Sequence, residues 1–271
     1  MNCDTKYPIL LVHGCGFRDV EHVNYWGRIP TILKNEGATL FYGHQDSWGS
    51  IENNAAMLRD TLNKILAETN CGKVNVIAHS KGGLEARFLI SSLDMADKVA
   101  SLTTMATPHH GSKTIDLLCK LPSCFFMLAS RFVNSFFRIL GDKSPDFQTA
   151  SKQFSTIFMK EFNKQNQDAP SVYYQSYAAV MKNPFSDIFM FWLNLVIGLF
   201  EGENDGLLTP KSAEWTNFRG VLRGTTNRGI SHMDEVDARR VNFTKKDSEK
   251  GIADIRKVYL DIVRGLKQMG L

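Results

Sequence analysis

The sequence predicts an α/β fold in which helices flank a mostly parallel central sheet. Two patterns carry this prediction. Short apolar runs of strand length alternate with helical stretches through the first half of the chain, and a serine turn joins one such run to a helix. The 271 residues are 43% hydrophobic and 22% charged, which is an ordinary globular composition. We therefore expect a single domain that spans residues 1–271.

The first half of the chain predicts two strand-helix-strand units. Each predicted strand is a short apolar run, and the four lie at 9–12, 38–42, 74–78 and 99–105. Helices are predicted between them at 25–34, 51–66 and 82–90. Ser50 is a favourable N-cap for the second helix, which repeats apolar residues at helical spacing.

The second half opens with an interruption of this alternation. Residues 111–146 are rich in leucine and phenylalanine and poor in charge, so we expect helices inserted outside the sheet. A helix at about 150–163, a strand at 172–179 and an amphipathic last helix follow. The apolar run at 188–200 is too short to cross a bilayer, and we expect it to be buried core rather than a lipid-facing wall.

Composition excludes several classes of protein. The net charge of +4 comes from 32 basic and 28 acidic residues without basic runs, so we do not expect nucleic acid as a partner. Five cysteines without a CxxC pair argue against a zinc ribbon, and the spacing of Cys119 and Cys124 does not favour a disulfide. The first residues leave no room for a signal peptide, so we expect a protein that stays in the cell or has lost its signal.

The strongest chemical motif is Ser80 with its flanking residues. It follows the apolar strand at 74–78 and opens the next helix, which is the context of a nucleophile elbow in the α/β-hydrolase fold. The residues two before and two after the serine must be small, because strand and helix pass closely there. Ala78 and Gly82 meet this requirement. We predict Ser80 as the nucleophile of a serine hydrolase.

A serine nucleophile needs a histidine base and an acid that orients it, and in this fold both follow the serine in the chain. Of the seven histidines, only His232 lies late enough. The glycine-punctuated loop at 201–207 offers Asp205, Glu203 and Glu201 as the acid, and spacing alone does not choose among them.

An oxyanion hole needs two backbone N–H groups that point at the developing negative charge. The residue after the nucleophile, Lys81, supplies one. His13 and Gly14 end the first strand, and the turn that they form predicts the N–H of Cys15 as the other.

Five blocks of the sequence resemble the bacterial triacylglycerol lipases typified by the Pseudomonas and Burkholderia enzymes. They occur in the family's order at 8–14, 78–87, 107–112, 204–207 and 232–236. The resemblance implies an α/β-hydrolase, selects Asp205 as the acid, and implies that the insertion at 111–146 is a helical lid that opens at an oil–water surface.

The resemblance also suggests a structural calcium ion near the loop of His232, because many members of the family bind one there. The chemistry itself requires no cofactor. Asp234 matches one aspartate ligand of the family, and Asp187 is a candidate for the other. Ala238 departs from the glutamine that often stands at its position, which puts the metal in doubt.

Together these features predict a carboxylic ester hydrolase that acts on long-chain acyl esters, as a triacylglycerol lipase does. A short-chain esterase, a thioesterase or a phospholipase of the same fold is the alternative, because the elbow fixes the chemistry and not the acyl chain. A non-catalytic lipid-binding relative is disfavoured, because every expected position holds a competent residue.

Overall fold

The structure, a computed structural model, describes residues 2–19, 24–120, 123–224, 228–241, 252 and 254–271. Within them six strands form one sheet in the order β2-β1-β3-β4-β5-β6, and every neighbouring pair is parallel. The strands are β1 Ile9–Val12, β2 Leu40–Tyr42, β3 Val74–His79, β4 Val99–Met105, β5 Tyr173–Ala179 and β6 Phe218–Leu222. The predicted parallel sheet is confirmed.

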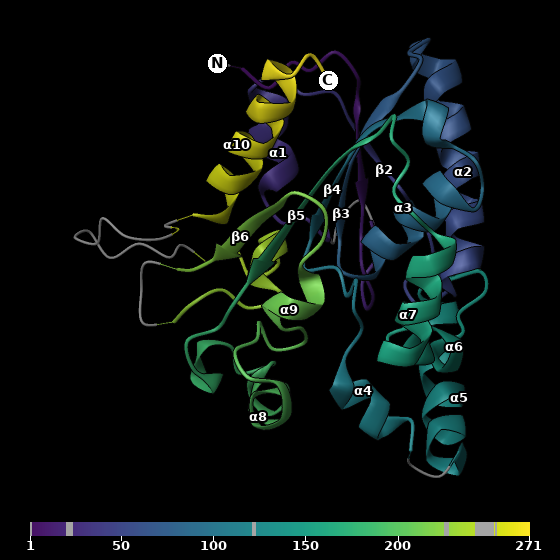
Figure 1. Ribbon diagram of the computed structural model, residues 1–271, viewed down its shortest axis with the longest axis vertical. Coiled ribbons are helices and arrows are strands. Elements are labelled where there is room, and N and C mark those ends of the chain that lie inside the picture. The colour runs from purple at the N-terminus through teal and green to yellow at the C-terminus, as the bar shows by residue number, and fades with distance from the viewer. Residues whose placement is uncertain (1, 20–23, 121–122, 225–227, 242–251, 253) are drawn as a thin grey trace.

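Helices cover both faces of the sheet (Figure 1). α1 and α10 lie on one face, α2 and α3 on the other, and the remaining helices gather near the carboxyl ends of the strands. The helices are α1 Ile29–Asn35, α2 Ile51–Thr69, α3 Lys81–Ser91, α4 Lys113–Leu118, α5 Ser123–Ile139, α6 Phe147–Lys152, α7 Thr156–Gln165, α8 Phe191–Glu201, α9 Pro210–Ala213 and α10 Ile255–Gln268.

Alternation along the strands divides the core into two layers. In β1, Ile9 and Leu11 pack on the side of α1 and α10, whereas Leu10 and Val12 pack on the side of α2 and α3. All four side chains are buried, as expected for a central strand of a parallel sheet.

Two predicted elements differ from the structure, and one strand was missed. The first helix begins at Ile29 rather than residue 25, because residues 25–28 form turns before Pro30. The helix expected at 150–163 is two helices, α6 and α7, separated by a short turn. β6 was not predicted, because an edge strand with Arg219 and Gly220 lacks a clear apolar alternation.

The insertion at 111–146 is helical, as predicted, and consists mainly of α4 and α5. Its far end is anchored to the body by two aspartates. Asp142 accepts hydrogen bonds from the backbone of Ser47 and Trp48 at 3.0 Å, and Asp46 accepts from the backbone of residues 143 and 144.

The expectation that the run at 188–200 is buried core is wrong. Ile188 and Leu199 are each 80% exposed and Trp192 is 73% exposed, so α8 turns one apolar face away from the protein. Only Asn194 and Ile197 of this helix are buried. An apolar run without polar periodicity normally predicts burial, but α8 lies beyond the sheet, where few neighbours cover it. Among the described helices, none has both the length and the apolar character needed to cross a membrane.

Candidate active site

Ser80 lies at the tip of the sharp turn between β3 and α3. Its φ of 54° and ψ of −129° place a non-glycine residue in a strained conformation, as a nucleophile elbow requires. The helix passes so close to β1 that a Cβ atom at Gly82 would collide with the carbonyl oxygen of His13. At Gly83 it would collide with the side chain of Thr107. The strain at Ser80 is thus held in place by close packing on both sides.

The structure brings Asp205 and His232 together from two loops at the carboxyl end of the sheet. His232 Nδ1 donates to Asp205 Oδ2 over 2.7 Å, while Asp205 Oδ1 accepts from the backbone N–H groups of Leu207 and Leu208 at 2.8 and 2.7 Å. Both carboxylate oxygens are therefore occupied, and the proton of His232 is fixed on Nδ1. This tautomer leaves Nε2 as the basic nitrogen.

His232 also lies beside the nucleophile turn. Its ring stacks at a tilt on the ring of His79, the residue before Ser80, with 4.4 Å between the ring centroids. The loop that holds His232 thus packs directly against the elbow.

The predicted oxyanion residues also lie beside the nucleophile. A Cβ atom built on Gly14 would stand 2.7 Å from Ser80 Cβ, so the turn that leads to Cys15 passes immediately over the serine. Lys81 is the first residue of α3, and its N–H has no acceptor within the helix. Burial raises the pKa of the Cys15 thiol to about 12, so the side chain stays protonated and only the backbone is suited to a role.

The Lys81 side chain is buried and takes no part in the predicted oxyanion hole, for which only the backbone N–H of Lys81 is needed. Its ammonium group pairs with Glu85 and donates to the carbonyl oxygen of Gly49 over 2.8 Å. Glu85 also accepts from Gln45 and Asn54, at 3.0 and 2.7 Å. This network of hydrogen bonds satisfies a buried ion pair and fixes the start of α3.

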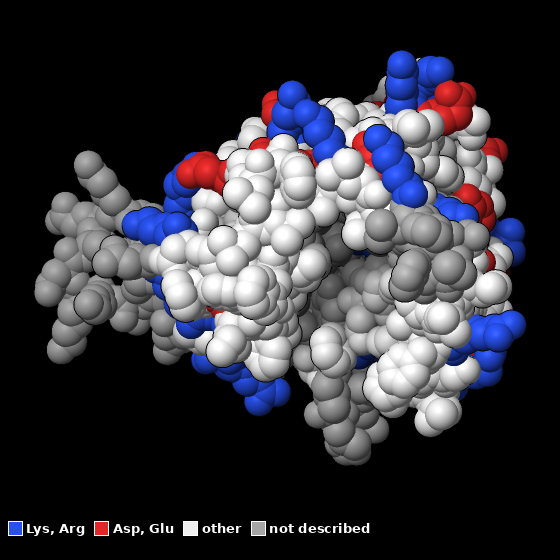
Figure 2. Space-filling view, turned by 90° about the horizontal axis from the view of Figure 1, so that it is seen from below, with Lys and Arg blue, Asp and Glu red and all other residues white. Residues whose placement is uncertain are grey.

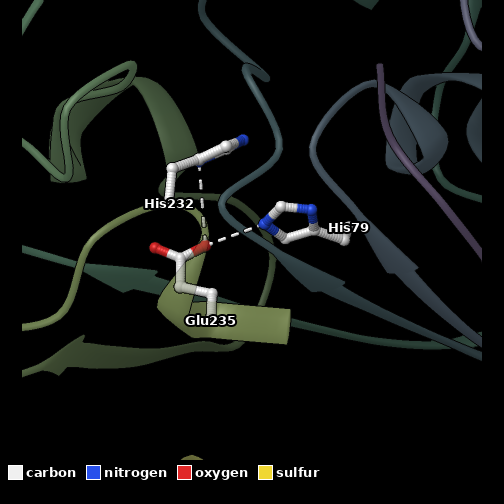
Figure 3. A group of neighbouring side chains, drawn as sticks. All are labelled: His79, His232 and Glu235. Carbon is white, nitrogen blue, oxygen red and sulfur yellow. Dashed lines mark hydrogen bonds and ion pairs between the residues drawn. The ribbon is translucent and has the colours of Figure 1, made fainter. Parts of the chain in front are cut away.

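Glu235 is a buried acid next to the Asp205–His232 pair that the sequence analysis missed. Its Oε2 lies 3.0 Å from His79 Nε2 and 3.9 Å from His232 Nδ1 (Figure 3). Burial and the neighbouring Asp205 carboxylate raise the pKa of Glu235 well above its usual range, which favours the protonated form of this group. The sequence feature that could have identified Glu235 is its position three residues after His232, a spacing of about one helical turn.

His79 joins Glu235 to the other side of the site. The Tyr25 hydroxyl lies 2.6 Å from His79 Nδ1, and His79 Nε2 lies 3.0 Å from Glu235 Oε2, so both ring nitrogens are hydrogen-bonded. Burial, with His232 as a secondary cause, lowers the pKa of His79 well below 6.5 and favours the neutral ring. A buried hydrogen-bonded chain thus runs from Tyr25 through His79 to Glu235.

The same cluster is the group of described residues best placed to ligate a metal. The ligand atoms of His79, His232 and Glu235 lie within 4.8 Å of one another. Their hydrogen bonds account for all three, however, because His232 Nδ1 is hydrogen-bonded to Asp205 and His79 Nε2 to Glu235. The geometry matches a hydrogen-bonded catalytic network.

The other two acids of the 201–207 loop have separate partners. Glu201 ends α8 and accepts hydrogen bonds from Ser112 and Thr114 at the start of α4, which lower its pKa against the effect of burial. Glu203 forms an exposed ion pair with Arg223 at 2.7 Å. Asp205 is thus the acid of this loop that meets His232.

Asp187 and Asp234, the two candidate calcium ligands, lie together behind the loop of His232. Arg239 lies between them, with its guanidinium nitrogens 3.1 Å from Asp187 Oδ2 and 2.6 Å from Asp234 Oδ2. Burial raises the pKa of Asp234 to about 6, and the nearby Arg228 opposes that shift. Of the two cysteines that are close in sequence, Cys119 is a free thiol, and the side chain of Cys124 lies outside the described residues.

Several known proteins are similar to this chain in sequence. Triacylglycerol lipase 2 of Saccharomyces cerevisiae is 28% identical over 279 residues, which cover 98% of this chain and 77% of the yeast protein. A triacylglycerol lipase of Burkholderia plantarii is 29% identical over 177 residues, 62% of this chain and 49% of its own, so the match spans about half of that protein. The predicted resemblance to bacterial lipases is confirmed.

Comparison with solved structures supports the fold. A metagenomic carboxyl esterase superposes with a TM-score of 0.73 at 16% identity, covering 98% of this chain and 76% of the esterase. Residues 8–236 match the palmitoyl protein thioesterase family, and they include the elbow, the acid loop and the histidine loop. The chain therefore belongs to the palmitoyl protein thioesterase family of α/β-hydrolases and is related to the bacterial triacylglycerol lipases.

Proposed function

We propose that this protein is a serine esterase that acts as a triacylglycerol lipase on long-chain acyl esters. The observation that carries the proposal is the pair of exposed apolar surfaces, on α5 and α8, at the end of the sheet that holds Ser80 and His232. A soluble enzyme for small polar esters has no need of such surfaces, whereas a lipid-facing enzyme does.

The reaction that this site suits is acyl transfer in two steps. Ser80 Oγ attacks the ester carbonyl carbon and gives its proton to His232 Nε2, and the backbone N–H groups of Cys15 and Lys81 hold the resulting oxyanion. His232 passes the proton to the departing alcohol as the C–O bond breaks. Water then attacks the acyl-enzyme in the same way, which releases the fatty acid and restores the serine hydroxyl. Asp205 stabilises the imidazolium in both steps.

We propose that the apolar face of α8 and the insertion with α5 form the lipid-facing surface, and that the insertion is the lid. Figure 2 views this end of the molecule: charged side chains lie toward its margin, and a hollow separates the α8 side from the α4 and α5 side. Exposed apolar side chains on the two sides are Phe185, Ile188, Phe189, Trp192, Leu199 and Phe200 near or on α8, and Leu128, Phe132, Ile139 and Leu140 on or just after α5.

A second substrate class is favoured by the family match. The family is described as palmitoyl protein thioesterase, and a thioester of a long acyl chain would meet the same nucleophile and the same apolar surfaces. Thioesters and oxygen esters share the tetrahedral intermediate, so the triad does not discriminate between them.

The test compares p-nitrophenyl esters of increasing acyl length, emulsified triacylglycerol and palmitoyl thioester. We expect activity to rise toward long chains, and Ser80→Ala to abolish it with the fold intact by circular dichroism. Ser171→Ala, at an exposed serine in the turn before β5, is the control and should keep full activity. Undiminished turnover by Ser80→Ala would contradict the proposal. Activity on short chains alone would indicate an esterase, and thioester preference the second class.

The lipid-facing role of α8 has its own test. Trp192→Ser combined with Leu199→Ser removes two exposed apolar side chains, each of which contributes about 1.5 kcal/mol or more when buried in lipid. We expect about a hundredfold weaker binding to triacylglycerol emulsion and unchanged turnover of a soluble short-chain ester. Met269→Ser, at a side chain 47% exposed near the C-terminus, is the matched control. Equal emulsion binding by both variants would rule out α8 as the contact surface.

A further inference from the structure

The loop that carries His232 is tied to the segment before α8 by two buried carboxylates. Asp187 and Asp234 are 0% and 2% exposed, and both engage Ser231, the neighbour of His232. Ser231 Oγ donates to Asp187 Oδ2 over 2.6 Å, and the Ser231 N–H donates to Asp234 Oδ2 over 3.2 Å. The position of the histidine backbone therefore depends on this carboxylate pair.

Two arginines neutralise the pair. Arg239 Nε lies 3.1 Å from Asp187 Oδ2 and donates to Asp234 Oδ1 over 2.9 Å, while its terminal nitrogen donates to Asp234 Oδ2 over 2.6 Å. Arg228 approaches Asp234 Oδ2 to 3.4 Å and donates from Nε to the carbonyl oxygen of Ser186 over 2.6 Å. Arg239 reaches the same carbonyl oxygen at 3.3 Å.

This donor set does not fit a calcium ion. Calcium needs six to eight oxygen ligands at about 2.3–2.6 Å. Among the described residues, the oxygens available here are those of the two carboxylates, the Ser186 carbonyl and Ser231 Oγ. Those of Asp234 and Ser186 already accept N–H groups from guanidinium, and those of Asp187 accept from Ser231 Oγ and a backbone N–H. A divalent ion would also stand beside two positive charges, and Ala238 offers no side-chain oxygen. The Arg239 guanidinium fills the space in which the carboxylates would meet a metal.

We propose that Arg239 is a permanent internal cation that replaces a structural calcium ion and positions the His232 loop without any divalent metal. Arginine stays charged at every physiological pH and binds carboxylates through two parallel N–H groups, so the clamp needs no free ion. Arg239 is a positioning residue in this scheme, since it acts on the base through Ser231 and Asp234. Its effect on turnover rests on the function proposed above, whereas its effect on stability does not.

The first experiment measures the thermal midpoint of unfolding, Tm, with EDTA and with added Ca²⁺. The wild-type protein should show the same Tm in both, and calorimetric titration with Ca²⁺ should detect no binding. Arg239→Ala should lower Tm by about 10 °C, because it leaves two buried carboxylates with one cation. Ca²⁺ should restore part of that loss. Arg223→Ala, which breaks an exposed ion pair, is the control and should shift Tm by about 2 °C or less.

The second experiment separates positioning from stability. With a soluble ester at a temperature where every variant is folded, Arg239→Ala should lower kcat with little change in KM, and Arg239→Lys should recover part of kcat. EDTA-induced loss of Tm or Ca²⁺ binding in the wild type would overturn the proposal, even if Arg239→Ala fails to fold. So would an Arg239→Ala Tm equal to that of the Arg223→Ala control. If no ester is hydrolysed, the proposed function fails, and the Tm measurements still decide the role of Arg239.

Discussion

Two pairs of buried carboxyl groups lie beside the His232 loop, and they are neutralised in different ways. Asp205 and Glu235 face the imidazole, and the raised pKa of Glu235 favours its neutral form, which removes one of the two charges. Asp187 and Asp234 lie behind the loop, and arginine side chains balance both charges. The neutral form of Glu235 is lost as pH rises, whereas Asp234, whose pKa burial raises to about 6, loses its charge as pH falls. The first pair is therefore neutralised by a proton, and the second by guanidinium cations.

The largest expected effect comes from breaking the pair that faces the imidazole. Asp205→Asn removes the carboxylate that fixes the His232 tautomer, and we expect kcat to fall by about 10⁴-fold with a small change in KM. Glu235 loses its negative neighbour in this variant and can ionise 3.9 Å from His232 Nδ1. The double variant with Glu235→Gln should therefore fall further than Asp205→Asn. Steady-state kinetics on a soluble ester measure both, and equal activities would show that Glu235 gives no support.

A smaller effect is expected from the arginine-held pair. Asp187→Asn preserves shape but leaves the buried Arg239 guanidinium short of one counter-charge, and we expect a loss of about 3 kcal/mol in the free energy of unfolding. Urea unfolding measures it. Asp97→Asn removes the acid of an exposed pair with Lys98 and should cost less than about 1 kcal/mol. A result for Asp187→Asn as small as that for the control would show that the clamp is not stabilising.

Measured per pH unit, the smallest effect is the pH dependence that Glu235 confers. Its pKa is raised in the folded protein, so the protonated form favours folding, and this contribution is lost as pH rises from about 4.5 through the folded pKa. Glu235→Gln cannot ionise. The stability of the wild type relative to this variant should therefore fall by up to about 1.4 kcal/mol per pH unit above pH 5. His79 is present in both proteins, so its titration largely cancels. Parallel stability curves between pH 5 and pH 8 would contradict the assignment.

Local sequence patterns predicted the scaffold well where a pattern is compatible with only one local structure. β1 and β4 have their predicted bounds, because a short apolar run between turns fits a central parallel strand and little else. The elbow was visible because the strained serine demands small neighbours such as Gly82. Chain order then singled out His232, and the structure places Asp205 against it.

Other features depend on tertiary neighbours that the sequence does not specify. α8 was predicted to be buried because its composition is apolar, yet its exposure is set by its place beyond the sheet. Glu235 was not singled out from the sequence, because its raised pKa results from burial in the folded protein and from the nearby Asp205. Arg239 and Asp187 are 52 residues apart in the chain, and no local sequence pattern predicts their contact.

The turn at Ser80 sets two selective pressures against each other. A residue with a Cβ atom at φ 54° and ψ −129° raises the free energy of the fold by an amount on the order of 1–3 kcal/mol, and glycine would relieve it. Selection for heat resistance alone would therefore favour Ser80→Gly and remove the proposed nucleophile. Retention of serine at this position therefore indicates selection for turnover. A screen of variants of this protein for thermostability should also assay activity, so that variants with Ser80→Gly are excluded.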